Sequence, residues 1–192
     1  MRIAVLGWGS LLWNPKDLAV EGEWQPDGPH LPIEFARVSG KNKDRLTLVC
    51  LEGAPWIRTY WINSRKAHLS DARENLRVRE GKRVDLVDIG YAARDGCSWI
   101  TPIHQIDETM REWLAIKKEL DAVIWTGLGS NFLRETQKSF SVDQGVKWLR
   151  ELVDQRGAEE YIRKAPPQTN TRLREQCRVS FGWTDLNVCG KC

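Results

Sequence analysis

Two glycines and a serine follow the first apolar stretch of the chain, within Leu6-Gly7-Trp8-Gly9-Ser10-Leu11-Leu12-Trp13. The residues before them, 2–5, are apolar and partly β-branched, which predicts a buried strand. Glycine at positions 7 and 9 permits positive φ angles and leaves room for a ligand to approach the backbone. Successive peptide N–H groups in such a turn can point inward and bind an anion. The same glycines could also simply let a strand turn sharply, so the loop alone leaves both interpretations open.

Glu80 is the second residue that could do chemistry, because it ends a predicted helix. Residues 65–80 carry apolar side chains three and four positions apart, and Gly81 is a natural residue to end the helix. A carboxylate at the negative end of the helix dipole is destabilised by ~0.3–1 kcal/mol, which raises its proton affinity and suits it to act as a base. The alternative is an exposed glutamate shielded by Arg77 and Arg79.

Both segments resemble motifs of the γ-glutamyl cyclotransferase-like superfamily, including its ChaC branch. Residues 6–15 resemble its Tyr-Gly-Ser-Leu or Tyr-Gly-Ser-Asn loop, with Trp8 in the place of the tyrosine. Residues 75–81, Asn-Leu-Arg-Val-Arg-Glu-Gly, resemble the segment that carries the catalytic glutamate. The ChaC branch has a Gly-Tyr pair within a few residues of that glutamate, whereas here Gly90-Tyr91 lies further on, so Tyr91 receives no role. The resemblance covers residues 3 to about 92.

The resemblance implies a fold and a reaction. The implied fold is α+β, a small and mostly antiparallel barrel-like sheet flanked by helices, with the loop beside the end of the 65–80 helix. In the implied reaction, the amine of a γ-glutamyl group attacks its own γ-carbonyl, forms 5-oxoproline and releases an amine or amino acid. Glu80 is then the catalytic base, and the substrate-binding residues are Trp8, Gly9, Ser10 and Leu11. This reaction requires no metal and no organic cofactor.

Two other classes of function remain open. The strand followed by Gly-x-Gly superficially resembles the start of a dinucleotide-binding domain, but Leu12 stands where the third glycine is needed and Asn14-Pro15 interrupts the helix that should follow. The chain could instead be a non-enzymatic module that binds a small anion or a protein partner, in which case Glu80 would be dispensable.

Composition indicates a globular chain. It has 192 residues, of which 41% are hydrophobic and 29% charged, enough for one domain with a substantial core. A net charge of +3 does not by itself argue for nucleic acid, and no apolar run approaches the ~18 residues of a membrane span. Without a signal-peptide pattern at the N-terminus we expect a cytoplasmic protein whose partner is a small γ-glutamyl substrate, with no nucleic acid or membrane. The sequence does not indicate an oligomeric state.

The cysteines do not suggest a disulfide framework, because they are five in number and scattered. Cys189-Gly-Lys-Cys192 is a single C-x-x-C without the second ligand pair that a zinc site needs, so we interpret it as a reduced tail and expect no metal. Nothing orients His104 toward Cys97 as a nucleophile–base pair, and we interpret His104 as structural.

Periodicity predicts the remaining elements. A short helix near Pro15 and a turn-rich loop over 21–31 are expected after the first strand. Strands over 32–38, 45–51 and 56–62 follow one another through short turns, which predicts an antiparallel meander. The 65–80 helix should begin at Asn63 or Ser64. The later elements are one or two strands over 83–103, a helix over 107–120, a strand over 121–127, and helices over 141–155 and 158–164. We expect a single domain, with a core over about 1–130 and a helical C-terminal extension over about 131–192.

Overall fold

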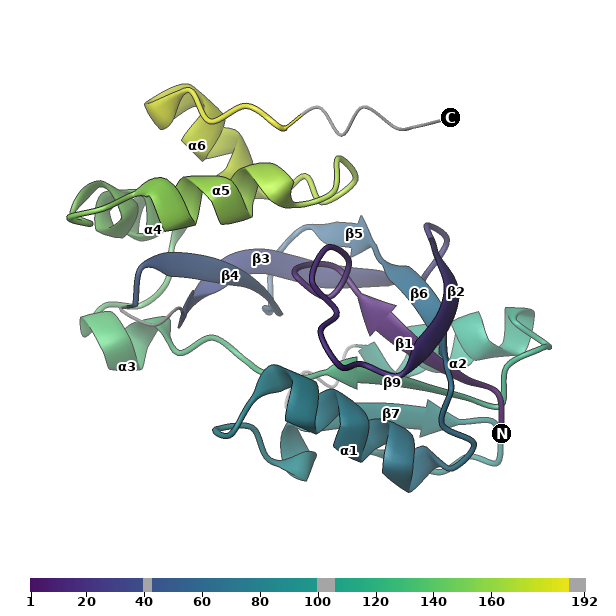
Figure 1. The fold of residues 1–192 in the computed structure, drawn as a ribbon. Coiled ribbons are helices and arrows are strands. Elements are labelled where there is room, and N and C mark those ends of the chain that lie inside the picture. The colour runs from purple at the N-terminus through teal and green to yellow at the C-terminus, as the bar shows by residue number, and fades with distance from the viewer. Residues whose placement is uncertain (40–42, 100–105, 187–192) are drawn as a thin grey trace.

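The strands form two sheets in the computed structural model, which describes residues 1–39, 43–99 and 106–186 (Figure 1). The larger sheet has the order β2-β6-β1-β9-β7-β8 and the smaller one the order β4-β3-β5. The strands are β1 (Ile3–Gly7), β2 (Val20–Gln25), β3 (His30–Ser39), β4 (Arg45–Cys50), β5 (Trp56–Arg58), β6 (Tyr60–Ser64), β7 (Ile89–Ala93), β8 (Ser98–Trp99) and β9 (Ala122–Thr126).

Helices cover these sheets. They are α1 (Leu69–Glu80), α2 (Ile106–Ile116), α3 (Phe132–Thr136), α4 (Val142–Arg150), α5 (Arg156–Lys164) and α6 (Arg172–Phe181), with a short 3₁₀ turn, η1, at Leu86–Asp88. The chain is therefore α+β, as expected. The sheet is mixed rather than uniformly antiparallel, because β1 pairs in parallel with β9 and antiparallel with β6.

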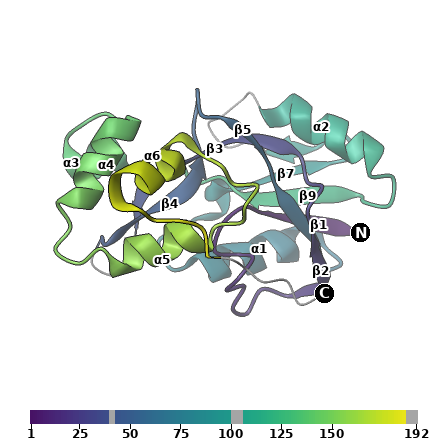
Figure 2. The same cartoon turned by 90° about the horizontal axis from the view of Figure 1, so that it is seen from above.

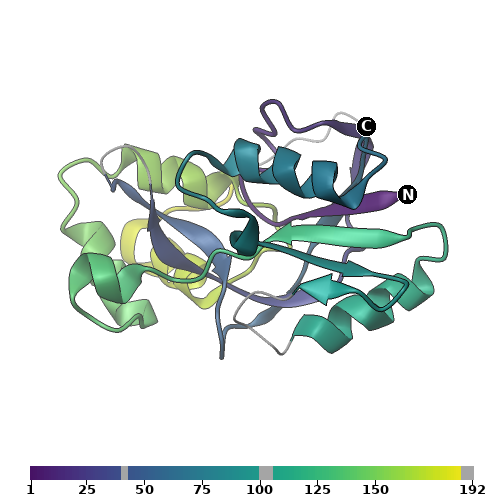
Figure 3. The same cartoon turned by 90° about the horizontal axis from the view of Figure 1, so that it is seen from below.

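The central strands β1 and β9 are buried on both faces. In β9, Val123 and Trp125 belong to the apolar cluster that includes α2, whereas Ala122 and Ile124 belong to the cluster that includes α1. Because strand side chains alternate between faces, α1 and α2 must cover opposite sides of the larger sheet, and Figure 3 shows them there. Because β1 and β9 pair in parallel, their carboxyl ends lie side by side at one edge of the sheet.

The succession β3, β4, β5 and β6 is not the simple meander that the short turns predicted. β3 and β4 form the expected antiparallel hairpin, but β3 is long enough to pair with β5 through His30–Pro32 and with β4 through Ile33–Ser39. β6 then leaves this sheet and pairs with β1 and β2. The break falls at Thr59, whose hydroxyl donates a 2.8 Å hydrogen bond to the Pro29 carbonyl.

Three local predictions were wrong. Residues 14–19 contain turns rather than a helix, and the predicted loop over 21–31 contains β2 and the start of β3. The helix expected from residue 65 begins only at Leu69, because β6 extends through Ser64 and pairs with β2. The end of that helix was predicted correctly: α1 stops at Glu80, and Gly81 has a φ of 114° that favours glycine.

The helices α3–α6 all fall in the predicted C-terminal extension, and α4–α6 pack over β3 and β4 (Figures 1 and 2). The extension shares a core with the N-terminal strands, since Leu6 and Leu173 belong to one buried apolar cluster. Among the described residues, every helix is too short or too polar to cross a membrane.

Glu34 attaches α6 to the smaller sheet. Its side chain on β3 is only 2% exposed, and its carboxylate accepts hydrogen bonds from the peptide N–H groups of Phe35 at 2.8 Å and Leu173 at 3.3 Å. Leu173 lies in the first turn of α6, where the helix dipole favours a negative charge. Burial nevertheless dominates and raises the pKa of Glu34 above its ordinary value of 4.5, against the lowering effect of these hydrogen bonds.

This raised pKa predicts a pH-dependent stability. The folded chain holds the Glu34 proton more tightly than the unfolded chain, so the contribution of this group is full below pH 4.5 and is lost as the pH rises through the folded pKa. Glu34→Gln should remove this decline from the free energy of unfolding, measured by urea denaturation at a series of pH values. Glu52→Gln, at an exposed turn, is the control and should keep the wild-type pH profile. An unchanged profile for Glu34→Gln would contradict the assignment.

Candidate active site

The two-glycine loop leaves the larger sheet at the carboxyl end of β1. Every residue of β1 is buried, and Gly7 is its last residue. The loop then turns on two hydrogen bonds, from the Leu12 N–H to the Gly9 carbonyl at 3.0 Å and from the Asn14 N–H to the Ser10 carbonyl at 2.8 Å. Trp8 is buried in the core cluster beneath it. The buried strand and the buried tryptophan therefore fix both the position and the direction of the loop.

The loop lines a cavity of about 710 Å³. Trp8, Gly9, Ser10 and Leu11, the four residues that the resemblance implies for substrate binding, all contribute to its wall. Within the described part of the chain, the peptide N–H groups of Gly9 and Leu11 have no backbone or side-chain acceptor. These two amides therefore remain available to a ligand.

Glu80 lines the same cavity from the end of α1. Its side chain is 16% exposed, so it is not the solvent-exposed glutamate of the alternative interpretation. The Oε1 atom accepts two hydrogen bonds at 3.1 Å, one from Nη1 of Arg79 and one from the Thr126 hydroxyl. Thr126 is the last residue of β9, which runs parallel to β1, so the two strands deliver the loop and this hydroxyl to the same edge.

Arg79 joins the glutamate to the loop. Its Nη2 atom donates to the Ser10 hydroxyl at 3.2 Å and to the Asn14 carbonyl at 2.7 Å, while Nη1 bonds Glu80. The side chain is 6% exposed. Arg79 thus compensates the unfavourable helix-end position of Glu80, whereas Arg77 bonds Glu74 instead. The loop lies beside the end of α1, as expected, because this guanidinium holds the two together.

Removal of this guanidinium should loosen the loop. Arg79→Met leaves the Asn14 carbonyl without its buried donor and the Glu80 carboxylate with the Thr126 hydroxyl alone, which should lower the free energy of unfolding by roughly 1–3 kcal/mol. Chemical denaturation measures the change. Arg77→Met is the matched control on the same helix and should cost less, because Arg77 has a more exposed side chain than Arg79. Equal losses in the two variants would show that Arg79 does not hold the loop.

Tyr161 packs against the two-glycine loop, although nothing in the sequence marked this residue as part of the site. It lies on α5, lines the cavity, and packs edge-on against Trp13 with ring centroids 5.3 Å apart. A Cβ atom added to Gly9 would lie 2.9 Å from the Tyr161 hydroxyl. Burial raises the pKa of Tyr161, against the lowering effect of hydrogen bonds from Ser10, so this hydroxyl keeps its proton. The C-terminal helices therefore take part in the site.

A second glycine-rich turn, residues 127–131, follows β9, and its Leu128 and Asn131 also line the cavity. The Gly129 carbonyl accepts a 2.7 Å hydrogen bond from Nη1 of Arg37, and the Asn131 amide bonds both backbone groups of Val38. This turn therefore attaches the end of β9 to β3. Nothing in its local composition distinguished it from an ordinary loop.

The cavity lining is strongly basic. Among the described residues, its carboxylates are Glu80 and Glu135. Its cationic side chains are Lys16, Arg37, Lys43, Arg45, Arg79, Arg83 and Arg134. A cavity with this excess of positive charge attracts anionic ligands.

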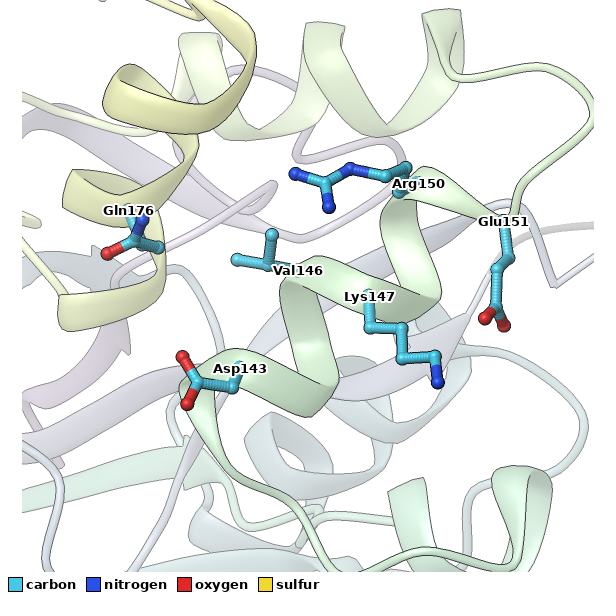
Figure 4. Close-up of a pocket in the computed structure, with 6 residues that line it drawn as sticks. All are labelled: Asp143, Val146, Lys147, Arg150, Glu151 and Gln176. Carbon is cyan, nitrogen blue, oxygen red and sulfur yellow. The ribbon is translucent and has the colours of Figure 1, made fainter.

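A second hollow, of about 410 Å³, lies between α4 and α6. Figure 4 shows that its charged side chains diverge: Asp143 and Glu151 stand at opposite ends of α4, and Lys147 points away from Gln176. Because the polar groups of the described residues do not converge there, we assign it no ligand.

The other residues considered for chemistry lie elsewhere. Cys97 is exposed, and the segments with His104 and with Cys189 and Cys192 lie outside the described residues. Tyr91 is on β7, with the Arg73 guanidinium 4.6 Å from its ring centre. No group of three or more potential metal ligands occurs within residues 1–39, 43–99 and 106–186.

Comparisons with protein-family models, with curated proteins and with solved structures find no match to this chain.

Proposed function

We propose that this protein is a γ-glutamyl cyclotransferase-type enzyme. We also propose that its fold is of the γ-glutamyl cyclotransferase-like kind, in which the strands around the cavity together correspond to a barrel-like sheet. The observation that carries the proposal is that Glu80 and the two-glycine loop line one cavity and are joined by Arg79. They are the two segments that resemble the superfamily's motifs, and they are about 70 residues apart in the sequence.

The two carboxylate oxygens of Glu80 have different surroundings, which supports different roles for them. Oε1 is held by Arg79 and Thr126, whereas Oε2 has no hydrogen-bond partner among the described residues. The carboxylate is therefore fixed through one oxygen and free to accept a proton with the other. A base must reach the proton that it abstracts within hydrogen-bond distance or through one water.

The proposed reaction moves protons between two nitrogens. Glu80 takes a proton from the substrate's ammonium, and the resulting amine attacks the γ-carbonyl carbon. The new C–N bond closes the lactam, and the amide C–N bond to the leaving amine breaks. Two protons in all leave the attacking nitrogen, and two reach the leaving amine, which departs as an ammonium ion. The loop supports this step by holding the α-carboxylate on its free amides, which orients the amine toward the carbonyl.

The test is incubation with a panel of γ-glutamyl amines and dipeptides, with 5-oxoproline and the released amine both measured. We expect the two products in equal amounts. The α-glutamyl isomers are the matched controls, because they lack the γ-amide that the reaction breaks. Release of free glutamate instead of 5-oxoproline would identify a hydrolase, and no turnover of any compound would overturn the proposal.

A non-enzymatic anion-binding module is the second candidate, and the basic lining of the cavity favours it. The two candidates differ in what Glu80 does. In a binding module its replacement leaves ligand affinity unchanged or improves it, since a negative charge is removed from an anion site. A nucleotide-binding domain of the doubly wound type is not supported, because β1 pairs in parallel with β9 alone and antiparallel with β6.

A further inference from the structure

The cationic side chains of the cavity are distributed unevenly. Glu80, Arg79 and the loop form the wall at the carboxyl ends of β1 and β9. The rest of the lining includes three arginines from β3, β4 and α3, namely Arg37, Arg45 and Arg134, which we call the basic wall. A ligand bound between these walls has one end at the glutamate and the other end among arginines.

Carboxylates of the protein neutralise only part of the basic wall. Arg134 bonds Glu135 at 2.9 Å and Arg45 bonds Asp44 at 2.8 Å. Within the described residues, Arg37 has no carboxylate partner, and its one hydrogen bond goes to the Gly129 carbonyl. Arg37 is also half-buried, near the C-terminal end of β3, so its charge is only partly hydrated.

The surroundings of Arg37 make an added anion favourable. Burial lowers the pKa of Arg37 below its ordinary value, and repulsion by Arg134 lowers it further, against attraction from Asp88, Glu135 and Glu80. An anion placed between Arg37 and Arg134 would offset both the lost hydration and the repulsion. Arginine is well suited to this role, because its planar guanidinium binds carboxylate or phosphate through two hydrogen bonds.

A γ-glutamyl group cannot supply that anion from its own end. Its α-carboxylate is used by the loop amides and its ammonium by Glu80, so the group is already neutralised. We infer that the leaving amine carries the additional negative charge: the substrate is a γ-glutamyl conjugate of an amine that carries two or more negative charges, on carboxylates or on a phosphate, which the basic wall binds. This inference rests on the proposed cyclotransferase function.

Two matched pairs of substrates test the inference and distinguish the two anions. γ-Glutamyl-glutamate is compared with γ-glutamyl-glutamine, which has nearly the same shape and one carboxylate fewer. γ-Glutamyl-phosphoethanolamine is compared with γ-glutamyl-ethanolamine. At low salt, kcat/KM from 5-oxoproline release should favour the more anionic member of at least one pair by about tenfold or more, since a hydrogen bond to a charged group is worth that much. The ratio should shrink as salt is added.

Arg37→Gln and Arg134→Gln locate the effect. Each should lower the preference for the more anionic substrate severalfold while changing kcat/KM for its less anionic counterpart little. Arg134 is highly exposed, so its replacement tests the inference even where Arg37→Gln unfolds the chain. Arg58→Gln is the control, because Arg58 is an exposed cation on β5 outside the cavity and its loss changes the net charge equally.

The outcomes separate this inference from the function on which it rests. Turnover of all four compounds at similar kcat/KM overturns the anionic leaving group and leaves the cyclotransferase standing. Equal loss of preference in Arg58→Gln and Arg134→Gln also overturns it, because the effect would then come from net charge alone. No 5-oxoproline from any compound overturns both proposals.

Discussion

Glu80→Gln is expected to lower kcat/KM for 5-oxoproline formation by about 10²–10⁴-fold, the usual contribution of general acid–base catalysis. Glutamine keeps the shape of the side chain, and its carbonyl oxygen can still accept the hydrogen bonds that Arg79 and Thr126 donate to Oε1. Only the free oxygen is changed, from a proton acceptor to an amide nitrogen. Substrate affinity and thermal stability should therefore change little.

Glu74→Gln is the matched control for this prediction. Glu74 lies earlier on α1, bonds Arg77 rather than Arg79, and does not line the cavity. It should turn over substrate at the wild-type rate. A wild-type rate in Glu80→Gln would show that Glu80 is not the catalytic base. A large loss of thermal stability in Glu80→Gln alone would instead identify Glu80 as a structural partner of Arg79.

The position of Glu80 could be predicted because local signals coincide there. A glycine ends the helix, the carboxylate occupies the last helical turn, and the segment resembles a known motif. Tyr161 and Arg37 gave no such signal. In the sequence, a tyrosine in an amphipathic helix looks like an ordinary core residue, and an arginine in an alternating strand looks like an ordinary surface residue. Only the packing of α5 against the loop and the attachment of β3 to the turn after β9 bring them to the cavity.

Helices and strands were predictable where apolar side chains recur on one buried face. They were not predictable where an element buries few side chains or buries a charged one. β2 is an edge strand with no fully buried side chain, so it lacks the apolar alternation that marks a strand. α6 was missed because one of its buried residues is Arg174, whose guanidinium bonds the backbone carbonyls of Pro166 and Thr169. A hydrophobic pattern counts such an arginine as exposed, although its carbonyl partners make its burial possible.

Gly9→Ala is expected to lower kcat/KM by about 10²-fold, the effect of displacing a substrate-positioning group by roughly 1 Å. Sequence reasoning assigned the space beside Gly9 to the ligand, but the structure shows Tyr161 on that side. An alanine Cβ would lie 2.9 Å from the Tyr161 hydroxyl and 3.5 Å from Cδ1 of Leu48. The loop or the tyrosine must then move, and either movement disturbs the free amides of Gly9 and Leu11.

Tyr161→Phe separates this steric effect from any other consequence of the methyl group. Removing the hydroxyl opens the space that the alanine Cβ needs, so Gly9→Ala/Tyr161→Phe should recover much of the activity that Gly9→Ala loses. The effects of substitutions at two residues in contact are expected to be non-additive in this way. The measurement is kcat/KM for the four proteins of the cycle, with thermal stability recorded for each. If the double variant is no more active than the product of the two single effects, Tyr161 does not position the loop, and the C-terminal helices lie beside the site without contributing to it.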